Sequence, residues 1–191
     1  MTPEVIGAKI IERASQFLGL HETAANAAWD NPATAGKDKA ADELLQALQA
    51  TGWQKGWPYC IAFCEAIWRS AYVDLGAPPA LLLRISRLVT PSVIQTYNQL
   101  GAEAPSLITR TPKPGAIYLL QSGNKPLGHA GIYVRGDGAQ FAGVEGNTSP
   151  APGTAEADRE GDGVFRKTRR VDYTPRAAGL WLRGFFNPLP W

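Results

Sequence analysis

Few side chains in this sequence could serve as a nucleophile or a base. Its 191 residues include two cysteines, Cys60 and Cys64, and two histidines, His21 and His129. Two cysteines cannot build a disulfide framework, and together with two histidines they form no recognisable zinc-ligand pattern. We therefore expect no metal and no organic cofactor. The chemistry that these residues offer most directly is attack by a thiolate with an imidazole as base.

Cys60 is predicted to lie in the first turn of a helix. Pro58 is favoured just before or at a helix start, and the apolar residues of IAFCEAIWRSAYVDLG recur at helical spacing up to Gly76. A thiol in the first turn faces backbone N–H groups and the positive end of the helix dipole, which both stabilise the thiolate. Cys64 falls on the apolar stripe of this helix, where a packing role is expected. The alternative for Cys60 is the same inert burial.

His129 begins the predicted strand HAGIYV, and a hairpin should place a polar partner beside it. The segment RGDG over 135–138 is typical of a hairpin turn. A loop centred between residues 136 and 138 sets His129 opposite a residue in 143–147, a stretch that contains Glu145 and Asn147. Because opposed residues share a face of the sheet, either side chain could orient the imidazole towards a thiol. The alternative is a structural histidine and a solvated Glu-Gly-Asn-Thr turn.

The elements that must position these residues are helices first and strands afterwards. Helical periodicity with glycine stops predicts helices in VIGAKIIERASQFL, ADELLQALQ, IAFCEAIWRSAYVDL and about 91–100, with Pro78 and Pro79 separating the last two and a polar loop over about 22–38. Five antiparallel strands are predicted in AIYLL, GHAGIYVR, AQFAGVEGN, GVFRKTRRV and GLWLRGFF. This order is typical of an α+β domain. We expect one domain over 1–191, helical over about 1–105 and sheet-forming over about 112–187.

Four segments taken together resemble one known family. WPYCIAFCEAIW, PKPGAIYLL, GHAGIYV and VEGNT occur in the order and near the spacing of the CHAP family, the cysteine- and histidine-dependent amidohydrolases and peptidases that cut bacterial peptidoglycan. The resemblance covers about Pro58 to Asn147, and GVFRKTRR is similar to the phage and prophage branch. It implies a papain-like core in which N-terminal helices pack on a five- to six-stranded antiparallel sheet.

The resemblance also implies roles for individual residues. Cys60 would be the nucleophile and His129 the general base, while Glu145 and Asn147 would orient the imidazole, with the third catalytic member left open between them. The related NlpC branch normally uses a second histidine as that third member, and no histidine follows His129 here.

Three further residues are candidate substrate contacts. Trp57 and Tyr59 lie just before Cys60 in the sequence and could form an aromatic wall on which a sugar or peptide stacks. Glu22 lies in a stretch similar to one that precedes the cysteine in the phage branch, which implies a contact with substrate.

The expected function is hydrolysis of an amide bond in peptidoglycan, either as an N-acetylmuramoyl-L-alanine amidase or as an endopeptidase on the peptide cross-links. One alternative is a catalytically degenerate module of the same fold that binds cell wall or a protein. Another is an intracellular thiol enzyme that cuts a different amide. Beyond peptidoglycan itself, a cognate inhibitor or a delivery apparatus would be natural partners.

Composition argues against several other classes of protein. The net charge is +2, and the basic cluster in RKTRR over 166–170 has no interleaved aromatic residues, which disfavours nucleic-acid binding. The longest apolar run, Tyr59–Cys64, is far shorter than the roughly 20 residues of a membrane span, so no membrane insertion is expected. The N-terminal segment carries Glu4 and Glu12 and lacks a secretory signal pattern. We therefore expect synthesis in the cytoplasm and access to the wall through phage lysis, a tail structure or effector secretion.

Overall fold

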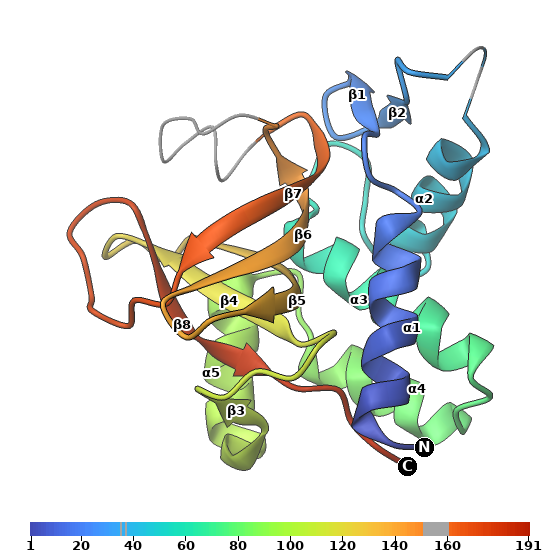
Figure 1. Cartoon of the computed structure of the whole chain (residues 1–191). Helices are drawn as coiled ribbons and strands as arrows, with labels where there is room; N and C mark the ends of the chain where they lie inside the picture. Colours follow the sequence, from blue (N-terminus) through green and yellow to red (C-terminus); the bar gives the residue numbers. More distant parts are fainter. Residues whose placement is uncertain (35, 37, 151–160) are drawn as a thin grey trace.

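The computed structural model describes residues 1–34, 36, 38–150 and 161–191, and these residues form the α+β arrangement that the sequence predicts (Figure 1). The helices in this part of the chain are α1 (Pro3–Ser15), α2 (Lys39–Gln49), α3 (Cys60–Asp74), α4 (Pro79–Leu88) and α5 (Val93–Glu103). The strands are β1 (His21–Ala24), β2 (Ala28–Asp30), β3 (Ile108–Thr109), β4 (Ile117–Ser122), β5 (Gly128–Gly136), β6 (Gln140–Thr148), β7 (Gly163–Arg170) and β8 (Leu180–Phe186).

All eight described strands belong to one antiparallel sheet in the order β2-β1-β7-β6-β5-β4-β8-β3. The five predicted strands correspond to β4–β8, but the expected five- to six-stranded sheet is extended by β1, β2 and β3. β1 and β2 lie in the predicted polar loop, within the part of the chain expected to be helical. They are too short to show the alternating pattern that identifies a strand, and β1 joins β7 through the pair His21 and Gly163.

The helices also differ from the prediction at one point. The segment around Pro78 and Pro79 was expected only to separate two helices, whereas Pro79 opens α4. Proline is tolerated in the first turn because its missing N–H has no acceptor there. Leu81, Ile85 and Leu88 then bury one face of this helix.

Helix α3 lies at the centre of the fold and is buried along most of its length. It packs against β5 and β6 on one side and against α1 and α2 on the other. The indole N–H of Trp68, midway along the helix, donates to the carbonyl of Gly115 at 2.9 Å and ties the helix to the chain just before β4. Figure 1 shows α1 to α4 gathered beside the sheet, so the N-terminus of α3 is fixed against the central strands.

The central strands bury both faces of the sheet. Ile117, Ile132 and Val144 point into the core shared with the helices. Tyr118 and Tyr133, one residue further along their strands, belong to a second apolar cluster on the opposite face. This alternation determines which polar side chains can meet within the sheet.

The two ends of the chain lie side by side (Figure 1), and the amino group of Met1 hydrogen-bonds the carbonyl of Trp191. None of the helices among the described residues combines the length and apolar character needed to cross a membrane.

Candidate active site

Cys60 is the first residue of α3, which confirms its predicted place in the first helical turn. The N-cap residue Tyr59 provides no side-chain hydrogen bond, and the first helical hydrogen bond runs from the N–H of Phe63 to the carbonyl of Tyr59 at 2.7 Å. The earlier N–H groups therefore have no acceptor within the helix, and their dipoles converge near the thiol. Cys60 retains 6% exposure whereas Cys64 has none, and burial raises the pKa of the Cys64 thiol well above its usual value.

The β5–β6 hairpin brings His129 and Glu145 into contact, and Glu145 lies within the stretch 143–147 that the turn position predicts opposite His129. Its register pairs Ile132 with Val144 and Tyr133 with Gly143. His129 Nε2 lies 2.9 Å from Glu145 Oε2, and both side chains are fully buried. Because the carboxylate can only accept, Nε2 carries the proton and donates it in this hydrogen bond.

The second ring nitrogen of His129 is left available for chemistry. Nδ1 is shielded from solvent and has no well-aligned hydrogen-bond partner. The Cys60 sulfur is close enough to stabilise the protonated ring both by its charge and as an acceptor. Helix α3 and strand β5 thus bring the thiol and the imidazole together, with the carboxylate on the far side of the ring.

The protonation state of His129 is set by opposing effects. Burial lowers the pKa of the imidazole, but the charges of Glu145 and Cys60 and hydrogen bonds to both outweigh it and raise the pKa to about 9. The imidazolium form of the ring is therefore favoured at neutral pH.

Glu145 is held by donors from three other strands. Tyr118 on β4 donates its hydroxyl to Oε1 at 2.5 Å. Arg169 on β7 donates Nε–H to Oε1 at 2.7 Å and Nη2–H to Oε2 at 2.6 Å. Burial raises the pKa of Glu145, but His129 and Arg169 together hold it far below its usual range. The carboxylate is consequently an anion with a fixed plane.

Two glycines provide the space for these groups. A Cβ on Gly131 would lie 2.3 Å from the Tyr118 hydroxyl and 2.7 Å from Glu145 Cγ. A Cβ on Gly143 would lie 2.5 Å from the Tyr118 ring. The Tyr118 ring and the Glu145 side chain can lie close to the sheet only because both neighbouring positions lack a side chain.

Asn147 is buried at the end of β6, two residues beyond Glu145. Its φ of 57° is in the left-handed region, where the pairing of β6 with β7 becomes irregular between Glu145 and Thr148. Its carbonyl accepts the N–H of Gly161 at 3.2 Å, and its backbone N–H contacts the hydroxyl of Tyr59. The structure thus brings Asn147 to the neighbourhood of the site, while Glu145 is the residue hydrogen-bonded to the imidazole.

The three predicted substrate contacts occupy different environments. Tyr59 is fully buried, and its hydroxyl accepts the indole N–H of Trp29 at 3.0 Å, so its ring offers no exposed wall and instead supports the start of α3 from within. Trp57 is 43% exposed and lines a small cavity beside Pro58 and Ala62.

Glu22 lies on β1 and is connected to the site through Tyr59. Its Oε2 accepts the N–H of Asn26 at 2.6 Å, and its carboxylate also interacts with the Tyr59 hydroxyl. Burial raises the pKa of Glu22. This residue therefore belongs to the polar surroundings of the helix start.

Sequence reasoning missed Tyr118 and Arg169. From the sequence, Arg169 stands out only as part of the basic cluster over 166–170. In the structure β7 alternates, with Phe165, Lys167 and Arg169 less exposed than Arg166 and Arg170. The one available signal was this alternation, which turns every second residue of a strand to the same face.

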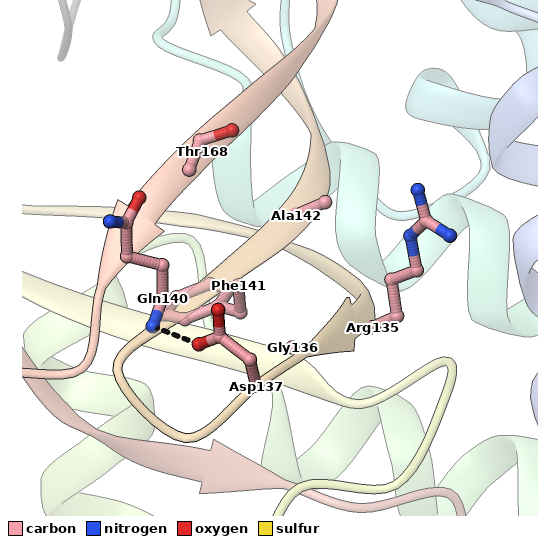
Figure 2. Close-up of a pocket in the computed structure, with 7 residues that line it drawn as sticks. All are labelled: Arg135, Gly136, Asp137, Gln140, Phe141, Ala142 and Thr168. Carbon is pink, nitrogen blue, oxygen red and sulfur yellow. Dashed lines mark hydrogen bonds between the residues drawn. The ribbon is translucent and has the colours of Figure 1, made fainter.

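A separate hollow of about 350 Å³ lies at the far end of the β5–β6 hairpin (Figure 2). Asp137 within it accepts the N–H groups of Ala139 and Gln140, and so closes the turn. The hollow contains none of the candidate catalytic residues. Across the described ranges of the chain, no three His, Cys, Asp or Glu side chains gather into a candidate metal site.

The chain matches no protein-family model, and no curated protein gives a significant match.

Proposed function

We propose that this protein is a cysteine hydrolase of the CHAP type, with a papain-like core, that cleaves an amide bond in bacterial peptidoglycan. The observation that carries the proposal is the arrangement of His129: one ring nitrogen is held by Glu145, and the other, Nδ1, is buried without a well-aligned partner next to Cys60 at the start of α3. A nucleophile, a base and an orienting carboxylate in this order form a recurrent unit of acyl-transfer enzymes.

The proposed reaction starts from a Cys60 thiolate and a His129 imidazolium. The Cys60 thiolate attacks the amide carbonyl carbon, and the imidazolium of His129 gives its Nδ1 proton to the leaving amine nitrogen as the C–N bond breaks. A thioester on Cys60 remains. Water then attacks the thioester carbonyl carbon, and His129 accepts a proton from this water. The carbon–sulfur bond breaks, so the thiolate leaves as the carboxylic acid product forms. Proton and nucleophile return to their starting positions.

The start of α3 can also stabilise the tetrahedral intermediate. Its first N–H groups have no acceptor within the helix, and no side chain caps them. We assign the backbone N–H of Cys60, with a neighbouring donor, to the negatively charged oxygen. Trp57, exposed beside this helix start, is the proposed surface for a sugar or peptide group.

The proposal is tested by incubating purified sacculi with the wild-type protein and identifying the released fragments by mass spectrometry. We expect new pairs of amino and carboxyl groups with intact glycan chains, and the position of the new amino group will distinguish amidase from endopeptidase. Cys60→Ala should release nothing, whereas Cys64→Ala, which changes a fully buried thiol, should give the same fragments as the wild type. Cleaved glycosidic bonds, or release by Cys60→Ala, would contradict the proposal, and a folded wild-type protein that binds sacculi without cutting them would indicate a binding module.

A further inference from the structure

We propose that Arg169 is a positioning residue of this site, which clamps Glu145 so that the carboxylate remains ionised and directed at His129 throughout the reaction. The inference rests on the proposed Cys60–His129 chemistry, and it assigns a task that neither the sequence motifs nor the hairpin geometry predict.

The contact geometry is that of a two-point clamp. The planar guanidinium reaches both carboxylate oxygens, with Nε 2.7 Å from Oε1 and Nη2 2.6 Å from Oε2 of Glu145. Two parallel hydrogen bonds fix the plane of a carboxylate, which a single lysine amine cannot do. Oε2 is also the atom that accepts from His129 Nε2. Rotation of the carboxylate away from the imidazole would therefore break the clamp as well.

The surroundings make the arginine's charge important. The Arg169 side chain is 11% exposed and that of Glu145 is fully buried, so the pair is little screened by water. The titratable groups that face Glu145 come from four elements: Tyr118 on β4, His129 on β5, Arg169 on β7 and Cys64 on α3. Cys60, also on α3, faces His129. Of these, His129 and Arg169 are the cations.

The reaction itself explains the need for a second cation. When the imidazolium has given its proton to the leaving amine, His129 is neutral. Without Arg169, Glu145 would then be a buried anion with no cationic partner. Burial alone raises the pKa of Glu145, so the carboxylate could then take up a proton and lose its hold on the ring. Arg169 remains charged at this stage, and keeps the carboxylate an acceptor for Nε2–H.

The test compares Arg169→Gln with Arg169→Lys and with the matched control Arg170→Gln, which removes the same charge from the neighbouring exposed residue of β7. Two rates are measured against pH: the initial rate on sacculi, and the rate at which iodoacetamide alkylates Cys60. Loss of Arg169 raises the pKa of Glu145, and a protonated Glu145 no longer supports the imidazolium that stabilises the Cys60 thiolate in the proposed mechanism. Both profiles of Arg169→Gln should therefore move to higher pH by about one unit or more on the acid side. Arg169→Lys should keep the wild-type position with a rate lowered about tenfold, since it retains charge but not the fork. Arg170→Gln should match the wild type.

A profile of Arg169→Gln that stays at the wild-type pH, with only a uniform loss of rate, would overturn the positioning role. If Arg169→Gln does not fold, Arg169→Lys decides the question, because a wild-type rate in that variant would equally overturn the clamp. The two readouts also separate the two proposals. A shifted alkylation profile in a protein that leaves sacculi intact supports the clamp and contradicts the proposed substrate, whereas unshifted profiles in a protein that cuts sacculi contradict the clamp alone.

Discussion

At the residue scale, the proposed site depends on one carboxylate that serves three side chains. Glu145 accepts from Tyr118, His129 and Arg169, and all four groups lie within the sheet. The sequence left the third catalytic member open between Glu145 and Asn147. The direct hydrogen bond to Nε2 favours Glu145, while the backbone contacts of Asn147 connect the end of β6 to Tyr59 at the start of α3.

This assignment predicts an order of activity losses. His129→Ala should reduce the rate on sacculi nearly as much as Cys60→Ala, because residues that act as a unit are not additive. Glu145→Gln should cost less than His129→Ala, since the imidazole remains but is less well oriented, and more than Asn147→Ala. Initial rates are compared at equal concentrations of folded protein, which thermal unfolding of the same preparations establishes. A larger loss for Asn147→Ala than for Glu145→Gln would make Asn147 the third member.

Local patterns explain why part of the site could be predicted. A helix start identifies Cys60, and a tight hairpin fixes which residues face His129, so both inferences need only short-range rules. The partners of Glu145 on β4 and β7 could not be found in this way. Strands β6 and β7 are joined by the long connection over 149–162 rather than by a tight turn, so no arithmetic on the sequence sets the register that brings Arg169 to Glu145.

At the scale of elements, the central strands carry two glycines next to the buried polar groups, and these glycines leave room for the larger side chains. Gly131 on β5 is paired with Tyr118 on β4, and Gly143 on β6 is paired with Tyr133 on β5. The Tyr118 ring lies against both glycines, and its hydroxyl donates a hydrogen bond to Glu145. Glycine normally weakens a strand. At these two positions it lowers strand propensity but leaves space for the side chains of the site.

Gly131→Ala should therefore destabilise the protein and lower its activity. The added methyl would lie 2.3 Å from the Tyr118 hydroxyl and 2.7 Å from Glu145 Cγ, so one of them must move. We expect a loss of about 1 to 3 kcal/mol in the free energy of unfolding, typical of overpacking. Gly101→Ala is the control: its Cβ has no neighbour within 4 Å, and alanine in the interior of α5 should add about 0.5 to 1 kcal/mol. Denaturant unfolding and hydrolysis rates are measured for both variants. Wild-type stability and activity in Gly131→Ala would refute the claim that Gly131 provides space for Tyr118 and Glu145.

The elements that the sequence did not predict are those that depend most on tertiary contacts. Strand β3 contains two residues and β2 three, and each exists because a longer neighbour supplies its hydrogen bonds. Helix α4 carried a usable signal, since Pro79 is compatible with a first turn and Leu81, Ile85 and Leu88 recur at helical spacing. Propensity identifies long periodic elements, and short edge strands escape it.

At the scale of the whole molecule, the site exists only where the helical part of the fold meets the sheet. Cys60 comes from α3, whereas His129, Glu145 and Arg169 come from three strands of the sheet. A buried imidazolium and carboxylate at this junction link the stability of the entire fold to pH, because both pKa values differ between the folded and unfolded chain.

The stability of the protein should therefore fall as the solution becomes alkaline. The folded-state pKa of His129 is raised from 6.5 to about 9, so its stabilising contribution is fully present below about pH 6.5 and is lost as the pH rises through about 9. We expect a decrease of about 1 to 3 kcal/mol in the free energy of unfolding over this window. Denaturant unfolding at pH 6, 7.5 and 9 measures it, with His129→Ala as the comparison. Equal slopes for the two proteins would show that His129 does not carry the effect.

The central claim, that Cys60 is a nucleophile activated by His129, is tested most directly by alkylation. Wild-type protein and His129→Ala are treated with iodoacetamide at mildly acidic pH, and peptide mass spectrometry measures the rate of labelling at each cysteine, with the fully buried Cys64 as the internal control. We expect rapid labelling of Cys60 in the wild type, no labelling of Cys64, and a labelling rate for Cys60 that falls by about tenfold or more in His129→Ala. Labelling of Cys60 at the same rate with and without His129 would contradict the central claim.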